Sequence, residues 1–312
     1  MQQLYTKFFL FALFGLFGSG LYAQAPIRVT SEFDEAKERF VIIGINDSQK
    51  SQSIVLMIEN IDGLVPSAKL PALKTLLPGE RRRLISLKRV GSSAPNFSIR
   101  FRYYGGTANP EINKEVRYVL PMTKGLTSRI RLAKDVKSII DSNAPTKQIY
   151  SLSFALVDGD TICAAREGVV EQVKQEGQKD LIKYTFSGSR NYINVRHRDG
   201  TIGRYVQFKN GSALVKFGDR ILAGTPLAIA QQSTIHGEAL FFFSVTYLKV
   251  QIDALKAPED WVDLKYVKPI FKTLEHEGLM EEGVTYTAYL DELLKMQEMS
   301  KRQIRRYKKG KY

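Results

Sequence analysis

Cysteine and histidine are scarce in this 312-residue sequence, and each shortage excludes a class of site. Cys163 is the only cysteine, so neither an intramolecular disulfide nor a thiolate metal cluster can form. It stands in the apolar stretch 161–165, which favours a small buried side chain over a reactive thiol. There are only three histidines, His197, His236 and His276, so few nitrogen ligands remain for a metal.

The N-terminus has few of the apolar residues that a membrane-spanning anchor, the alternative to a cleaved signal, would need. The apolar run 8–17 follows a lone Lys7 and ends before small residues, well short of the ~20 residues that span a bilayer. This order is typical of a secretory signal, with cleavage after Ala23 or Ala25. We therefore expect residues 1–25 to be a signal peptide, and the chain to be exported to the periplasm or to associate with the outer membrane.

Positive charge is abundant and unevenly placed. The formal net charge is +14, and the last twelve residues carry half of it without any acid. Such a tail is attracted to anionic lipid, cell-wall polymer or an acidic protein surface, or it is simply solvated. In an exported protein we expect no nucleic acid partner. The basic residues of this tail are Lys301, Arg302, Arg305, Arg306, Lys308, Lys309 and Lys311.

Residues 26–122 have the pattern of a small β domain. Apolar stretches are separated by turn-forming sequences, and 97–104 alternates apolar and polar side chains as a half-buried strand does. Several short strands at this spacing predict an immunoglobulin-like β-sandwich, which serves as a spacer or a docking surface. The predicted strands are 40–45, 53–61, 82–90, 97–104 and 115–122.

Residues 123–147 read as a linker with a short helix, because Ile130, Leu132 and Val136 lie near helical spacing and Pro145 would end it. From 148 to 250 the chain reads again as β, with a hairpin turn at Asp199-Gly200. The strands predicted in this region are 168–173, 181–186, 192–197, 202–208, 213–217, 226–230 and 239–248.

Four motifs of residues 148–250 resemble, in order, the LytM-type domain of the M23 zinc endopeptidases. They are ICAAREGVV at 162–170, INVRHRDGTIGRYVQF at 193–208, LVKFGDRILAGTPLAIA at 214–230 and HGEALFFFSV at 236–245. The Gly-Asp hairpin at 217–224 is the most specific of them. Lipoyl and biotinyl carrier domains share a similar hairpin, but the exposed lysine turn that they require is absent. A small cleavage-region residue followed by Gln24 also resembles envelope proteins of the Bacteroidetes.

The resemblance implies a zinc site whose ligands this sequence lacks. The family binds zinc with a His and an Asp four residues apart and with the second His of a His-x-His strand. In this sequence Ile149 corresponds to the first His and Ser153 to the Asp. In the His-x-His strand, Leu240 and Phe242 correspond to the first and the second His. A slip of one residue would substitute Ala239 and Phe241, which are equally apolar. The histidine that stabilises the family's transition state corresponds to Gln207, which cannot carry the imidazole proton.

A relic groove is therefore expected instead of a catalytic centre, and the apolar residues 239–243 are expected to fill it. Its predicted residues are Ile149, Tyr150, Ser153, Tyr205, Gln207, Leu240 and Phe242. We expect no cofactor. The three histidines are interpreted as surface residues; His236 with Asp158 or Asp160 is the alternative for a weak metal site.

Residues 251–312 are predicted to be an extension with a helix over 287–306 that packs back on the body. The sequence thus predicts a mainly β protein: an immunoglobulin-like β-sandwich, a LytM/M23-like antiparallel sheet domain and a helical basic tail. The favoured function is a non-catalytic binding, scaffold or regulatory module of the cell envelope, with an envelope protein or peptidoglycan as partner. The alternatives are an active M23 endopeptidase with ligands elsewhere and an envelope assembly or secretion component.

Overall fold

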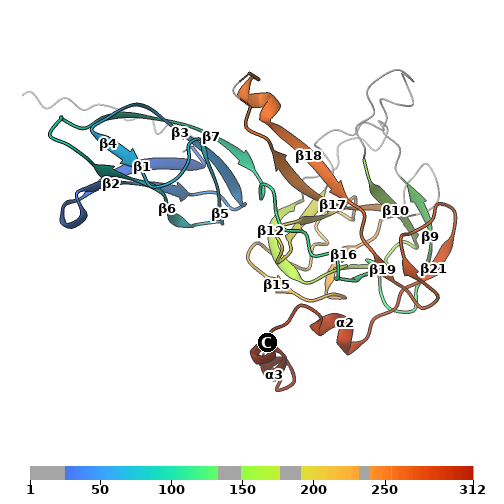
Figure 1. The fold of residues 1–312 in the computed structure, drawn as a ribbon. Coiled ribbons are helices and arrows are strands. Elements are labelled where there is room, and N and C mark those ends of the chain that lie inside the picture. Colours follow the sequence, from blue (N-terminus) through green and yellow to red (C-terminus); the bar gives the residue numbers. More distant parts are fainter. Residues whose placement is uncertain (1–24, 133–148, 176–190, 232–238, 254, 312) are drawn as a thin grey trace, which may run out of the picture.

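The computed structural model describes residues 25–132, 149–175, 191–231, 239–253 and 255–311. The predicted signal peptide, most of the predicted linker helix and the predicted strand 181–186 lie outside these residues. The described chain is mainly β and forms two bodies side by side (Figure 1). Its helices are short, and none of those described is long and apolar enough to cross a membrane.

Two antiparallel sheets form the N-terminal body, with strand orders β1-β2-β6-β4 and β5-β3-β7. Ile42 and Leu87 of the first sheet share a buried core with Ile54 and Leu76 of the second. The elements are β1 (Ile27–Asp34), the 3-10 turn η1 (Glu35–Lys37), β2 (Arg39–Asn46), β3 (Gln52–Asp62), β4 (Leu64–Pro66), β5 (Ala72–Leu76), β6 (Arg81–Arg89) and β7 (Asn96–Gly105).

Four of the five strands predicted in this body are confirmed, in β2, β3, β6 and β7. The fifth prediction, 115–122, is wrong in extent and in partner. Only β8 (Tyr118–Val119) is a strand there, and it pairs in parallel with β19 (Phe271–Lys272) of the C-terminal body. The segment after β7 has therefore already crossed into the second body.

A nine-stranded sheet forms the centre of the C-terminal body. Its order is β15-β12-β13-β14-β17-β10-β9-β21, and β18 pairs with the second half of the long β17. The strands are β9 (Thr127–Leu132), β10 (Ser151–Leu156), β12 (Gly168–Lys174), β13 (Tyr192–Arg196), β14 (Ile202–Val206), β15 (Arg220–Ile221), β17 (Ala239–Val250), β18 (Val262–Val267) and β21 (Thr285–Thr287).

One face of this sheet is the core face. Phe154, Tyr205, Phe241 and Phe243 are all buried there. Along β14 and β17 the buried rings alternate with partly exposed neighbours, whereas on β10 the neighbouring Ser153 is buried as well. Two small sheets complete the body, β11-β16 and β20-β19-β8. Their remaining strands are β11 (Thr161–Cys163), β16 (Pro226–Ile229) and β20 (Glu277–Gly278). The predicted strand 213–217 is wrong, because these residues form an irregular connection.

The helix predicted for the linker is wrong over residues 127–132, which form strand β9. Ile130 is fully buried, whereas Arg129 and Arg131 are exposed, so the side chains follow the period of two that a strand requires. The sheet also continues beyond Val250, because β18 pairs with β17 and β21 pairs with β9. Residues on both sides of the motif-bearing segment thus complete its sheet.

The two bodies share a small apolar cluster and buried hydrogen bonds. Val55 of β3 packs with Leu248, Val250 and Trp261 of the second body. Ser51 donates a hydrogen bond to the Glu171 carboxylate at 2.5 Å, and both side chains are buried. These contacts fix the first body beside β17 and the 3-10 turn η2 (Pro258–Trp261).

Two short helices replace the single helix predicted over 287–306. They are α2 (Glu292–Met296) and α3 (Lys301–Tyr307). Met299 is buried between them, and Ser300 begins α3 with a capping box, so the chain turns inward and starts a new helix. Packing on the body is confirmed, because the Gln297 amide donates to the main-chain oxygen of Arg117 at 2.8 Å.

Candidate functional site

Strands β10 and β17 bring two of the predicted metal positions together. Ser153 and Phe242 are direct partners in the antiparallel register, and Ala155 pairs with Leu240. Partners of this kind point to the same face, with Cβ atoms roughly 4.5–5.5 Å apart. Leu240 and Phe242, not the slipped pair, therefore share a face with Ser153, opposite the core face.

The side chains at these positions do not fit zinc. A hydroxyl and an aromatic ring stand where a carboxylate and an imidazole would be needed, and zinc in proteins is bound by thiolate, imidazole or carboxylate groups. Among the residues that the structure describes, no three His, Cys, Asp or Glu side chains could hold a metal ion together. The face can offer shape and hydrogen bonds to a ligand, but we derive no metal chemistry from it.

The other predicted groove residues are divided between the two faces. Tyr205 lies on the core face, where its buried hydroxyl accepts a hydrogen bond from the main chain of Ala165 at 2.8 Å; it is not a groove residue. Gln207 follows the end of β14 with φ of 73°, a left-handed conformation that is uncommon for residues other than glycine. Ile149 and Tyr150 directly precede β10.

Filling of the groove by residues 239–243 is only partly correct. Ala239, Phe241 and Phe243 point into the core, so Leu240 and Phe242 alone face the predicted groove. Tyr150 is partly buried at the edge of the core, and its hydroxyl has no hydrogen-bond partner among the described residues. Burial raises the pKa of this hydroxyl.

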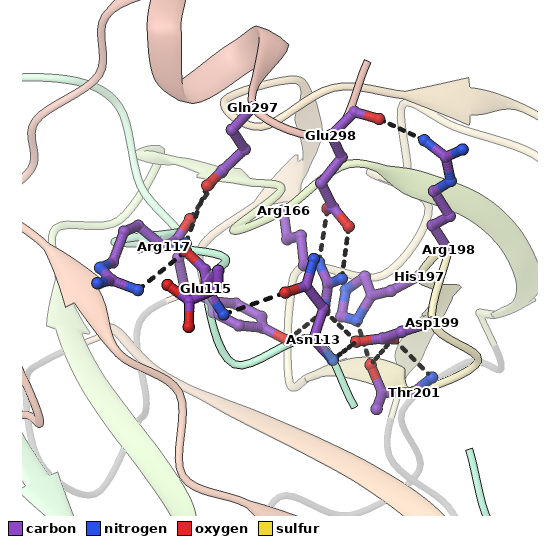
Figure 2. Close-up of polar contacts among 11 residues, drawn as sticks. Asn113, Glu115, Arg117, Arg166, His197, Arg198, Asp199, Thr201, Gln297 and Glu298 are labelled. Carbon is purple, nitrogen blue, oxygen red and sulfur yellow. Dashed lines mark hydrogen bonds and ion pairs between the residues drawn. The ribbon is translucent and has the colours of Figure 1, made fainter. Parts of the chain in front are cut away.

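A buried charge cluster that the sequence did not reveal lies on the core side (Figure 2). The Arg166 guanidinium is fully buried and donates to both carboxylate oxygens of Glu298, at 2.7 and 2.6 Å. It also donates to the Tyr118 hydroxyl at 2.8 Å and to Asp199 at 2.9 Å. Two carboxylates and one phenol thus surround a single guanidinium.

The electrostatics of the cluster keep Arg166 and Asp199 charged. Burial alone would lower the pKa of Arg166, but the Glu298 hydrogen bonds and the neighbouring negative charges raise it instead. Burial alone would raise the pKa of Asp199, yet the charge of Arg166 and hydrogen bonds from Thr201 lower it. The cluster joins the segment between α2 and α3 to the hairpin between β13 and β14 (Figure 2).

His197 belongs to this cluster, and its interpretation as a surface histidine is wrong. It is fully buried, and its Nδ1 shares a hydrogen bond with the Thr201 hydroxyl at 2.9 Å. Burial, followed by repulsion from Arg166, lowers its pKa well below the ordinary value of 6.5. A Cβ at Gly203 would lie 2.9 Å from the Nε2 of His197, so the glycine makes room for the ring. A neutral histidine beside Arg166 is a packing residue here.

The remaining histidines give no metal site in the described chain. His276 is partly buried against Tyr286, with ring centroids 5.7 Å apart. His236, the centre of the alternative metal site, lies outside the described residues. Asp160 accepts a hydrogen bond from the main chain of Val157 at 2.9 Å and so stabilises its own turn.

The charge cluster left only a weak signal in the sequence. Arg166 and Glu167 are two adjacent charged residues in the apolar segment 162–170, which suggests that one of them is buried in an ion pair. Its partner Glu298 is 132 residues away in a segment rich in charge, so no local pattern identifies it. Cys163, in contrast, is buried as predicted, and burial raises the pKa of its thiol to about 11.

Solved structures of several peptidases, two of them described as M23 proteins, are similar to this chain at low sequence identity. The catalytic domain of the antimicrobial peptidase lysostaphin from Staphylococcus simulans is 15% identical with a TM-score of 0.27, over 46% of this chain and 87% of that chain. Csd3 from Helicobacter pylori is 11% identical with a TM-score of 0.30, over 90% and 82%. A zinc-containing peptidase from Vibrio cholerae is 15% identical with a TM-score of 0.27, over 73% and 85%.

No family model matches the sequence, and no curated protein matches it either. The similarity to these solved structures is one of fold only, at low identity and low TM-score. The proposals that follow rest on the residues of this chain.

Proposed function

We propose that this chain is an exported, catalytically inactive module of the LytM type that works by binding in the bacterial cell envelope. The observation that carries the proposal is the direct pairing of Ser153 with Phe242. The motifs that resemble a zinc endopeptidase are retained around these two positions, while neither side chain is a zinc ligand. Peptidoglycan remodelling is the process that such a module would serve.

A polar row on the sheet face of Ser153 supports binding. Ser244 pairs with Arg204, and Arg204 pairs with Asn194 on the next strand. Arg204 donates to Asn194 at 3.4 Å, and Asn194 donates to Gln172 at 3.0 Å. These side chains are partly exposed, so their remaining donors and acceptors can bind the amides and hydroxyls of a polymer.

The two ends of the chain have supporting roles in this proposal. The N-terminal two-sheet body acts as an immunoglobulin-like spacer or docking surface. The basic residues of α3 and the following turn contact an anionic lipid or polymer. All seven of them are exposed. For an anionic lipid surface, binding to vesicles that contain phosphatidylglycerol should fall at high salt and should be lost when residues 300–312 are removed.

Incubation with insoluble peptidoglycan and added zinc tests the central proposal. The chain should sediment with the polymer and release no soluble peptide fragments. Release of fragments would support the active endopeptidase instead. Failure to sediment would exclude peptidoglycan as the ligand and would leave an envelope protein as partner.

A matched pair of charge reversals tests the binding face. Arg204→Glu, in the polar row, should weaken sedimentation with peptidoglycan. Arg100→Glu, on strand β7 of the other body, should leave it unchanged. Equal effects of the two substitutions would show that net charge, not the polar row, controls binding.

A further inference from the structure

A cavity of about 350 Å³ lies where three parts of the chain meet, away from the paired Ser153 and Phe242. The N-terminal body contributes Leu77, strands β12, β13 and β15 with the residues next to them contribute most of the lining, and Gln303 of α3 completes it. Three guanidinium groups line it, those of Arg196, Arg198 and Arg220. Glu167 is the one carboxylate of the lining.

Arg196 and Arg198 are held in place by groups that leave donors available. Arg196 donates from Nε to Glu171 at 2.7 Å. Arg198 donates from Nη1 to the main-chain oxygen of Glu298 at 2.5 Å, a contact that positions the guanidinium without neutralising it. Two guanidinium groups are thus fixed at the cavity before any ligand arrives, Arg196 by an ion pair with Glu171 and Arg198 by a neutral main-chain oxygen, which lowers the entropy cost of binding.

Arg220, on β15, completes the positive lining. Its side chain is exposed, and within the described part of the chain it makes no hydrogen bond or ion pair. A planar guanidinium has five N–H donors and binds oxyanions in a forked geometry. Arg220 is therefore the group of this cavity with the most donors to offer to a ligand.

Glu167 should repel a bound anion less strongly than a solvated carboxylate would, because its environment favours the neutral, protonated form. Its Oε2 is buried and has no hydrogen-bond partner among the described residues. Burial, and then the charge of Glu298, raises the pKa of Glu167. When protonated, this carboxyl would itself become a hydrogen-bond donor.

We propose that this cavity is an oxyanion site, which binds a carboxylate or phosphate group through Arg196, Arg198 and Arg220. Arg196 is paired with the Glu171 carboxylate, and Arg198 and Arg220 share the single carboxylate of Glu167. One positive charge is therefore left over, and one anion restores the local charge balance. Charge-assisted bonds from a guanidinium to an oxyanion are about twice as strong as neutral hydrogen bonds. The site joins the two bodies and α3, so its ligand also stabilises their arrangement.

Calorimetric titration of the full chain with inorganic phosphate and, separately, with acetate at low ionic strength tests this proposal. We expect saturable binding to one site. Arg220→Gln should weaken it about tenfold, the effect of losing one charge-assisted hydrogen bond. Tighter binding of phosphate would identify a phosphate group as the natural ligand chemistry, and tighter binding of acetate would identify a carboxylate.

Arg100→Gln is the matched control, since Arg100 is an exposed arginine of β7 whose only ion-pair partner in the described chain is Glu59. Both variants should unfold at the temperature of the unmodified chain, because both side chains are exposed. The absence of saturable binding for both anions would overturn the proposal. Equal weakening by the two substitutions would overturn it as well, because binding would then depend on net charge alone.

Discussion

At the scale of single residues, the guanidinium of Arg166 is a buried charge whose loss should lower the stability of the fold. It is fully buried and surrounded by Glu298, Asp199 and Tyr118. A buried ion pair adds little net stability when it is compared with well-packed apolar residues in place of both partners. Removal of one partner is costly, because a charge is left buried without compensation.

Arg166→Met should therefore lower the free energy of unfolding by about 3–5 kcal/mol, because the carboxylates of Glu298 and Asp199 would stay buried without their positive partner. Urea unfolding monitored by the fluorescence of Trp261, the only tryptophan, measures the loss. The control Arg100→Met breaks an exposed pair and should cost less than about 1 kcal/mol. Similar losses for both variants would contradict the assignment of Arg166 as a buried structural charge.

His197 should make the fold sensitive to acid. The pKa of His197 is lowered well below 6.5 in the folded chain, so below pH 6.5 the unfolded chain binds a proton that the folded chain excludes. The free energy of unfolding should then fall as the pH drops below 6.5, by up to about 1.4 kcal/mol per pH unit for one proton.

The variant His197→Asn isolates this contribution, because Asn can still bind Thr201 and does not titrate. Urea unfolding between pH 5 and 7 should give a shallower pH dependence for the variant than for the unmodified chain. The surrounding charged groups, Arg166, Arg196 and Asp199, are present in both chains. Identical slopes would show that His197 titrates normally in the folded state.

The sequence predicts the burial of a single residue correctly only where the residues next to it in the chain determine that burial. Cys163 was predicted to be buried from its apolar stretch, and it is buried. His197 was misread, because its turn sequence is charged while its burial is produced by Tyr118 and Arg166 from distant segments. Contacts between residues far apart in the chain leave no periodic pattern that could reveal them.

At the scale of elements, most strands follow from local alternation. The helix prediction over β9 is wrong because the spacing of Ile130, Leu132 and Val136 fits the helical period as well as the strand period of two. The exposed Arg129 and Arg131 on either side of the buried Ile130 show that the period is two. The C-terminal helix was misread because Glu298 and Met299 turn inward, a tertiary preference that local helix propensity does not contain. The pairing of Ser153 with Phe242 could not be predicted either, because β10 and β17 are far apart in the sequence and their register is set only in the folded sheet.

The start of α3 should depend on its capping box. The Ser300 hydroxyl accepts a hydrogen bond from the Gln303 main chain at 3.3 Å, and the Gln303 side chain accepts one from the Ser300 main chain at 2.9 Å. Ser300→Ala should cost about 1 kcal/mol, so amide hydrogen exchange in α3 should become about fivefold faster. The amides of α2, which is capped by Asp291, are the internal control and should not change.

At the scale of the whole molecule, the C-terminal segment completes the fold rather than trailing from it. Strands β18 and β21 extend the large sheet, and Glu298 binds Arg166 at the end of this segment. After Met299 the basic side chains are exposed, and only Gln303, Ile304 and Tyr307 are partly buried. The residues on which the stability of the fold depends most should therefore end at Met299.

Two truncations test this boundary. A chain that ends at Met299 should unfold within a few degrees of the full chain, because Glu298 is retained. A chain that ends at Met296 loses Glu298 and should unfold about 10 °C lower, the shift expected for a loss of several kcal/mol. Equal unfolding temperatures, measured by circular dichroism, would contradict the structural role of Glu298.

Restoring the missing zinc ligands supplies a positive control for the account of the site. The combined variant Ile149→His, Ser153→Asp and Phe242→His places one carboxylate and two imidazoles at positions of which two are direct sheet partners. This variant should bind about one zinc ion per chain. If the variant bound no zinc, the paired positions on β10 and β17 would not correspond to the zinc-binding positions of the family.

The most direct test of the central claim is the zinc content of the unmodified chain, purified after exposure to zinc and dialysis and measured by mass spectrometry. We predict zinc no higher than in the buffer, because Ser153 and Phe242 offer no ligand set. About one zinc per chain would contradict this account and would restore the alternative of an active endopeptidase.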